Sequence, residues 1–135
     1  MAFVLDASVA GVWMFQDEQH PQADIALDLL RDEPAMVPTL WWFEVRNMLV
    51  LGERRGRISE TARIEFLAFL KRLPIEIALL PRDDDIFELA HRHGLTFYDA
   101  CYCELARREG LRLATLDGKL AQAARKEGVP LLGLA

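Results

Sequence analysis

The amino-acid sequence predicts a single α/β domain, an α/β/α sandwich with a mainly parallel sheet between helices. Short apolar runs, of the length of buried strands, alternate with longer segments whose apolar residues recur at helical spacing. The chain has 135 residues, the usual size of one domain, and 52% of them are hydrophobic. No repeat, linker or low-complexity tract divides the sequence, so we expect one domain over residues 1–135.

Five segments are predicted to form the strands. Four are short apolar runs, at residues 3–5, 36–37, 111–116 and 131–132. The other, at residues 75–79, alternates apolar and polar residues as a strand with one solvated face does. Because helical segments separate them, we expect neighbouring strands to run parallel.

Six segments are predicted to be helices, over residues 23–30, 40–52, 61–73, 86–93, 97–108 and 120–126. The last three each lead into a glycine, at Gly94, Gly110 or Gly128, with a basic residue at most two positions earlier. A glycine after basic residues is a common C-terminal stop of a helix, so these three ends are well defined.

The charge balance excludes a protein that coats nucleic acid by bulk attraction. There are 16 Lys and Arg residues against 21 Asp and Glu, a formal net charge of -5, so any phosphate contact needs a local basic patch or a cation. No apolar run approaches the ~18 residues of a membrane span, and no basic signal-peptide flank precedes Asp6. Cys101 and Cys103 point to different sides of a predicted helix and cannot easily pair. We therefore expect a soluble, cytoplasmic protein with free thiols.

Two aspartates, Asp6 and Asp117, directly follow predicted strands. Ligands of an open α/β sheet bind beyond the carboxyl ends of its strands, so two carboxylates at two such ends could meet. Ser8 and Thr115 each lie two residues from one of them, on the same side of an extended chain, where a hydroxyl could hold a ligand or water. The alternative is that these side chains cap the helices that follow.

Two further carboxylates, Glu44 and Asp99, lie on predicted helices. Glu44 shares its helix face with large apolar residues, and a buried charge is costly without a partner. Asn47, one turn further on, could orient this carboxylate or a water. The alternatives are that Glu44 reaches the rim or pairs with an arginine, and that Asp99 forms a helix cap together with Thr96.

Together these four carboxylates form a candidate metal and catalytic site with oxygen ligands only. Its members are Asp6, Glu44, Asp99 and Asp117. Such ligands suit Mg²⁺ or Mn²⁺ rather than zinc or copper. Without a cation they would repel one another and raise at least one pKa. The matching chemistry is phosphodiester hydrolysis, in which the metal lowers the pKa of a bound water and neutralises charge on the phosphate.

Four segments resemble the motifs of the PIN-domain nucleases, and among them the VapC-like toxin ribonucleases of bacterial and archaeal toxin-antitoxin pairs. Residues 3–10, followed by Trp13, are similar to the start of that family, with its first acidic residue at the strand end. Residues 38–49 match the helix pattern Pro…Glu-x-x-Asn-x-Leu that carries the second acidic residue. Residues 94–106 and 110–117 match the paired third and fourth motifs, so the resemblance spans the chain.

The resemblance implies a PIN-like sandwich whose five strands have the order 3-2-1-4-5, with the first and fourth strands adjacent. It implies Mg²⁺- or Mn²⁺-dependent endonucleolytic cleavage of RNA by a toxin. Its partners would be a second copy in a homodimer and a cognate VapB-like antitoxin. The residues to which it assigns catalysis and metal binding are Asp6, Glu44, Asp99 and Asp117, with Thr115 as the hydroxyl helper and Ser8 and Asn47 as further candidates.

Two arginine clusters and three tryptophans lie outside the acidic motifs. The arginines, at positions 54, 55 and 57 and at positions 107, 108 and 112, either stabilise helix C-termini or contact RNA phosphates. Trp41 and Trp42 are adjacent on one helix, so they cannot both face one core, and at least one should meet solvent or a partner. Trp13 could lie in the core, at a dimer interface or in an antitoxin groove.

Other classes of function fit the sequence less well. A PIN-fold RNA-binding or RNA-processing module that is not a toxin stays an alternative, although a module without cleavage should lack an acidic position. A phosphatase or phosphoacceptor domain would place Asp-x-Asp after the first strand or an acidic residue after the third, but Ser8 takes the second place and the third strand ends in Leu80-Pro81. A zinc site from His91, His93, Cys101 and Cys103 is disfavoured, because each pair lies two residues apart on a helix.

Overall fold

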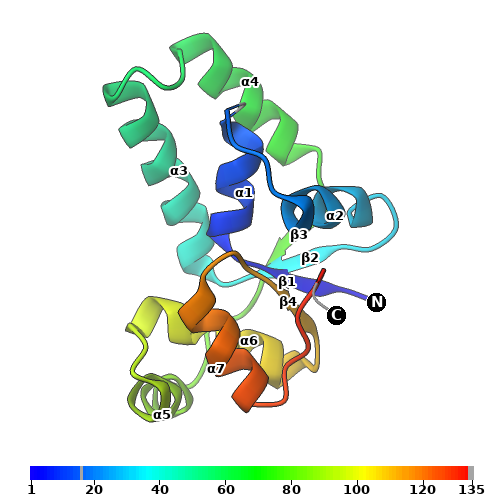
Figure 1. The fold of residues 1–135 in the computed structure, drawn as a ribbon, viewed down its shortest axis with the longest axis vertical. Helices are drawn as coiled ribbons and strands as arrows, with labels where there is room; N and C mark the ends of the chain where they lie inside the picture. The colour runs from blue at the N-terminus through cyan, green and yellow to red at the C-terminus, as the bar shows by residue number, and fades with distance from the viewer. Residues whose placement is uncertain (16, 134–135) are drawn as a thin grey trace.

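Four parallel strands form the sheet, in the order β3-β2-β1-β4 (Figure 1). They are β1 (Phe3–Leu5), β2 (Ala35–Val37), β3 (Ile75–Ile77) and β4 (Arg112–Ala114) in this computed structural model, which describes residues 1–15 and 17–133. Phe3 of β1 lies opposite Ala35 on one side and Arg112 on the other. All three residues of β1 are fully buried, as expected for a parallel strand covered on both faces.

The prediction of a fifth strand at residues 131–132 was wrong. Leu131 forms an isolated parallel bridge with Leu113, outside any described strand. The N–H of Leu113 donates to the Pro130 carbonyl, and the Leu113 carbonyl accepts from the N–H of Leu132, both at 2.9 Å. Because Pro130 has no N–H and Gly133 turns the chain with a φ of 78°, the ladder does not extend. The segment still lies beside β4, where the order 3-2-1-4-5 puts a fifth strand.

The described residues form seven helices. They are α1 (Ala7–Met14), α2 (Pro21–Leu29), α3 (Thr39–Arg54), α4 (Glu60–Lys71), α5 (Asp83–His93), α6 (Phe97–Glu109) and α7 (Gly118–Lys126). Six were predicted from helical spacing, with ends that differ by a few residues. The missed helix is α1, in which six of eight residues are buried. A helix covered on nearly all sides shows no alternation between an apolar and a polar face, so spacing did not reveal it.

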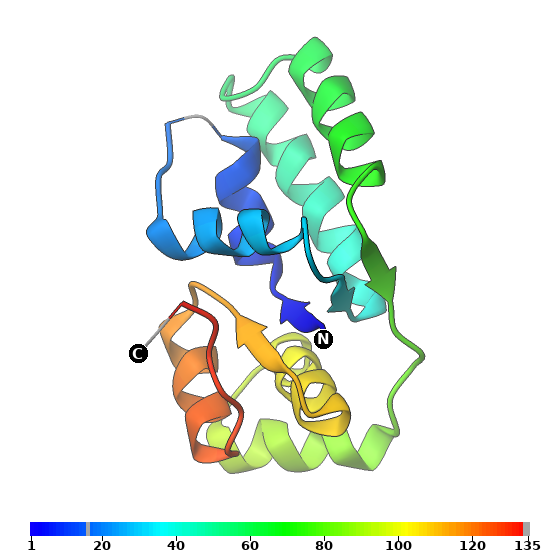
Figure 2. The same cartoon turned by 90° about the vertical axis from the view of Figure 1, so that its right-hand side faces the viewer.

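The helices form two layers, one on each face of the sheet (Figures 1 and 2). One layer holds α1, α2, α3 and α4, and the other holds α5, α6 and α7. Within the first layer α3 and α4 form a hairpin that extends beyond the sheet (Figure 1). The strand ends that lead into α1 and α7 therefore lie between the layers, which is where the predicted site residues are.

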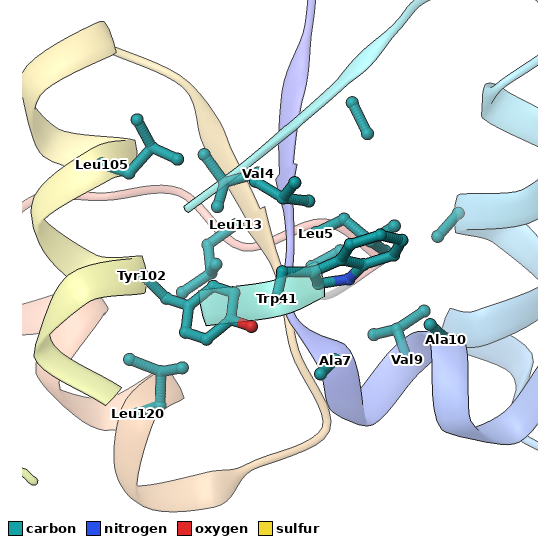
Figure 3. Packing of buried hydrophobic residues seen from close by; sticks show 14 of the residues in the cluster. Val4, Leu5, Ala7, Val9, Ala10, Trp41, Tyr102, Leu105, Leu113 and Leu120 are labelled. Atoms are coloured by element: carbon teal, nitrogen blue, oxygen red, sulfur yellow. The ribbon is translucent and has the colours of Figure 1, made fainter. Parts of the chain in front are cut away.

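The core contains one of the two adjacent tryptophans and leaves the other exposed. Trp41 packs in the core near Val9 and Leu5 (Figure 3), whereas Trp42 is 44% exposed. Trp13 is partly buried, and its indole N–H donates to the Ala23 carbonyl at 2.9 Å. The expectation that Trp41 and Trp42 face different ways is confirmed.

The edge strand β3 is less covered than predicted. The face of this strand that was expected to be buried is partly open to solvent, since Ile77 is 53% exposed. Leu79 and Leu80, which follow it, are also exposed and lie outside any strand. Among the described helices, none combines the length and the apolar character that a membrane crossing requires.

Candidate active site

Asp6 lies at the carboxyl end of the central strand and is almost completely buried. Its backbone N–H donates to the Ala114 carbonyl at 2.9 Å, so the pairing of β1 with β4 continues to this residue. Its side chain forms no capping bond to α1, so the helix-cap alternative is wrong for Asp6. Instead, Oδ2 accepts hydrogen bonds from the hydroxyls of Ser8 and Thr115, each at 2.7 Å.

The hydroxyls of Ser8 and Thr115 connect Asp6 to the loop after β4. Thr115 Oγ1 accepts from the N–H of Asp117 at 3.0 Å, and Ser8 Oγ accepts from the N–H of Leu116 at 3.0 Å. Each hydroxyl therefore donates to Asp6 and accepts from the backbone of the second loop. This arrangement holds the two strand ends, and with them two of the four predicted carboxylates, in a fixed relation.

Asp117 both caps a helix and belongs to the acidic cluster. Its Oδ1 accepts from the N–H groups of Lys119 and Leu120, at 2.9 and 3.1 Å, so the cap alternative is confirmed for one oxygen of this residue. Its negative charge nevertheless raises the pKa of both Asp6 and Asp99. The two interpretations of Asp117 are therefore compatible.

Glu44 projects from α3 and is bonded to a residue of the opposite layer. Its Oε1 accepts a hydrogen bond from the hydroxyl of Tyr102 on α6. Burial raises the pKa of Glu44 to about 7, the charges of Asp6 and Asp99 add to the rise, and the Tyr102 hydrogen bond opposes it. Asn47 is exposed and forms no hydrogen bond with Glu44, so its predicted orienting role has no support.

Asp99 lies in the first turn of α6, where Thr96 is the N-cap. The Thr96 hydroxyl accepts from the N–H of Asp99 at 3.1 Å, so the capping is done by the threonine. Burial raises the pKa of the Asp99 carboxyl, and the negative charges of Asp117 and Asp6 raise it further. The Asp99 carboxyl is therefore near enough to Asp117 and Asp6 to be affected by their charges.

The four predicted carboxylates come from separate segments and lie near enough for their negative charges to interact. Burial raises the pKa of Asp6 as well, although the hydrogen bonds from Ser8 and Thr115 oppose that rise. Among residues 1–15 and 17–133, no three Asp, Glu, His or Cys side chains lie close enough together to hold a metal ion by themselves. The donor set nonetheless fits Mg²⁺ or Mn²⁺, because a hydrated Mg²⁺ ion keeps several waters and needs only one or two carboxylates.

Comparison with known proteins identifies the family. Residues 3–126 match the PIN domain. The chain belongs to the PIN-domain family. Over 126 residues it is 33% identical to a curated relative, Ribonuclease VapC3 of Pyrobaculum aerophilum, a match that covers 90% of this chain and 94% of the relative. The resemblance seen in the four sequence motifs is therefore confirmed, and this PIN domain is VapC-like.

Solved structures show the same fold. PAE2754 from Pyrobaculum aerophilum superposes with a TM-score of 0.74 at 24% identity, over 93% of this chain and 86% of that one. VapC20 of Mycobacterium tuberculosis, described as a toxin that cleaves the sarcin-ricin loop, superposes with a TM-score of 0.63 at 19% identity. That match covers 90% of this chain and 94% of that one. At these identities the two likenesses support the fold.

Tyr102 is the site residue of this PIN domain that sequence reasoning missed. It lies three positions after Asp99 on the same helix, and residues three apart share one helix face. That spacing could have indicated that Tyr102 lies near the site. A tyrosine among apolar helix residues, however, is more readily interpreted as part of the core. The hydrogen bond to Glu44 became apparent only once α3 and α6 were placed on opposite sides of the sheet.

Most of the predicted arginine candidates are paired within the chain. The pairs are Arg57 with Asp17 and Glu18, Arg107 with Glu127, Arg108 with Glu104, and Arg112 with Glu33. Arg54 and Arg55 are exposed and take part in none of these pairs. RNA contact therefore has more support at Arg54 and Arg55 than at the second cluster. The described histidines and cysteines form no zinc site: Cys101 and Cys103 are buried free thiols.

Proposed function

We propose that this PIN domain is the toxin of a toxin-antitoxin pair, a ribonuclease that hydrolyses RNA phosphodiester bonds internally with Mg²⁺ or Mn²⁺. The observation that carries the proposal is that Asp6, Glu44, Asp99 and Asp117 come from separate segments yet lie near enough for their charges to interact: burial and neighbouring negative charges raise the pKa of Asp6, Glu44 and Asp99. The ribonuclease relative supports it. RNA and an antitoxin would both meet the protein in the cytoplasm, where we place its activity.

Each site residue has a role in the proposed reaction. Asp6, Glu44, Asp99 and Asp117 would hold the metal, which when bound lowers the pKa of a water and offsets charge on the phosphate. Ser8 and Thr115 fix Asp6 by donating to its Oδ2. Burial raises the pKa of Glu44 to about 7 when no cation is bound, so binding of the cation near neutral pH would release a proton from this side chain. Asp117 holds the start of α7 and so positions its loop at the site.

The antitoxin is proposed to act at the same acidic cluster. A pocket with up to four negative charges attracts a guanidinium, which matches carboxylates in bidentate geometry, so an inserted Arg would compete with both metal and RNA. Trp41 is excluded as an anchor for the antitoxin because it is 4% exposed. Trp42 is exposed, with the guanidinium of Arg46 4.3 Å from the centre of its ring, and stays a candidate anchor.

The homodimer is proposed to form through an exposed apolar face. This face consists of Phe43, Leu79, Leu80, Phe97 and Tyr98, which line a groove of about 420 Å³. Leu79 is 86% exposed and Leu80 is 79% exposed, and an apolar patch of this kind marks an interaction site. A two-fold contact would place this face of one copy against the same face of the other.

The test of the proposed function is RNA cleavage by the purified chain with Mn²⁺ or Mg²⁺. Asp6→Asn or Asp117→Asn should reduce cleavage by at least ~100-fold while leaving the fold intact. Asp24→Asn, at an exposed position of α2, is the matched control and should cleave like the wild type. A circular RNA distinguishes internal cleavage from attack on ends. If the wild type cleaves no RNA, or the Asn variants cleave as well as it does, the nuclease assignment is wrong.

The toxin role is tested separately from the chemistry. Expression of the wild type alone should arrest bacterial growth, and co-expression of the neighbouring gene product should relieve the arrest. RNA cleavage in vitro without growth arrest in cells would favour the alternative, an RNA-processing module that is not a toxin.

A further inference from the structure

We infer that Tyr102 is a positioning residue of the nuclease site, whose hydroxyl fixes the carboxylate of Glu44 and thereby sets the affinity of the site for its cation. The inference rests on the proposed metal-dependent function. It starts from one contact, the hydrogen bond from the Tyr102 hydroxyl to Glu44 Oε1. No other hydrogen bond to the Glu44 carboxylate is present among the described residues.

The ring of Tyr102 is fixed by the core. Tyr102 is 0% exposed and is among the largest fully buried side chains of the described residues. Figure 3 shows the ring between Leu105 and Leu120, with its hydroxyl pointing away from α6 toward the middle of the molecule. A side chain enclosed in this way keeps one rotamer, so its hydroxyl is a fixed hydrogen-bond donor.

Glu44, in contrast, has little else to hold it. It is part-buried on α3, in the other helix layer, 58 positions away from Tyr102 in the sequence. A glutamate has three rotatable side-chain bonds, and holding it in one conformation costs entropy unless a partner orders it. The bond to Tyr102 supplies that order across the sheet and leaves Oε2 as the oxygen free to face a cation.

The position of Tyr102 on α6 also connects Glu44 with Asp99. Asp99 and Tyr102 are three residues apart and share one face of α6, so this face presents one carboxylate directly and orients a second one. A buried hydroxyl without a hydrogen-bond acceptor would destabilise the fold, so the packing that buries Tyr102 also favours the conformation of Glu44 that accepts its hydrogen bond. Partners that orient metal ligands typically change metal affinity or activity about 10- to 100-fold when they are mutated.

The experiment compares Mn²⁺ binding by the purified full-length wild type and Tyr102→Phe, using calorimetric titration. Tyr102→Phe removes one oxygen and keeps the ring, so the core stays filled. The expected result is a Kd for Mn²⁺ that rises about 10-fold. RNA cleavage should fall at low Mn²⁺ and recover at saturating Mn²⁺, because the ligands themselves are unchanged. A merely structural role would lower the melting temperature and leave this Mn²⁺ dependence unchanged.

Thr61→Val is the matched control. Thr61 is an exposed residue of α4 that forms no hydrogen bond to the site residues, so the loss of its hydroxyl should leave the Kd for Mn²⁺ unchanged. Glu44→Gln provides the second variant. If Tyr102 acts through Glu44, then adding Tyr102→Phe to Glu44→Gln should cause no further loss of Mn²⁺ affinity.

The outcomes separate this inference from the proposed function. A wild type that neither binds Mn²⁺ nor cleaves RNA overturns both. A wild type that does both, together with a folded Tyr102→Phe variant of equal Mn²⁺ affinity, overturns only the role of Tyr102. A Tyr102→Phe effect that persists in full in the Glu44→Gln background also overturns it, because the residue would then act on another ligand.

Discussion

Replacing Glu44 by glutamine should make the metal-free protein more stable at alkaline pH. Burial raises the pKa of Glu44 from 4.5 to about 7, so ionising this side chain is less favourable in the folded than in the unfolded chain. The folded state binds more protons between these two pH values, and stability therefore falls as pH rises through about 7. Glutamine keeps the shape and accepts the Tyr102 hydrogen bond, but it carries no charge.

The size of the effect follows from the pKa. At about 1.36 kcal/mol for each pKa unit, the full rise would correspond to roughly 3.4 kcal/mol. Because Glu44 is only part-buried, solvent screens its charge, and we expect about half of this, or about 1.7 kcal/mol, at pH 8. For a chain of this size that equals a melting temperature about 5 °C higher in Glu44→Gln than in the wild type.

The assay is thermal unfolding in the presence of chelator at pH 4.5, 6, 7 and 8. The advantage of Glu44→Gln should be present at pH 8 and nearly absent at pH 4.5, where the wild-type side chain is protonated in the folded state and already half protonated in the unfolded chain. Adding Mg²⁺ at pH 8 should narrow the gap, because the cation favours the ionised carboxylate. A variant that is less stable than the wild type at pH 8, or a gap that is the same at both pH values, would refute the electrostatic reasoning.

Four further predictions test the site, the core and the partners. Millimolar Mn²⁺ or Mg²⁺ should raise the melting temperature, and chelator should remove the rise. In Asp99→Asn the rise should be smaller, and an unchanged rise would show that the metal binds at another place. Trp42→Ala should weaken a complex with the antitoxin by roughly 2 kcal/mol in a binding titration, and an unchanged affinity excludes Trp42 as an anchor. Trp41→Ala should instead destabilise the fold by about 3–5 kcal/mol in urea unfolding, since Trp41 is buried. Leu80→Glu should convert a dimer into monomers in light scattering without loss of folding, and a variant that stays dimeric would exclude this face.

Local pattern was sufficient for much of the fold. Strand β1 and the carboxylates at the strand ends could be recognised because a buried parallel strand is a short apolar run and a site residue follows it directly. Helices with one solvated face, such as α5 and α7, were recognised from their spacing and from the glycines that follow them. The local sequence pattern did not predict α1, because that helix is buried on nearly all sides. It wrongly predicted a strand at residues 131–132, where Pro130 interrupts the pairing.

The sequence by itself determined which residues could form the site: the four carboxylates, the hydroxyls of Ser8 and Thr115, and the family to which their motifs belong. Only the tertiary structure decided how they are connected. In the folded chain, Ser8 and Thr115 donate hydrogen bonds to Asp6, and Tyr102 donates one to Glu44. Trp41 is buried while Trp42 is exposed, and most of the arginines form ion pairs. The physical reason is that a hydrogen bond depends on tenths of an ångström between atoms, and for residues 58 or 109 positions apart that distance is set by how the two helix layers pack on the sheet.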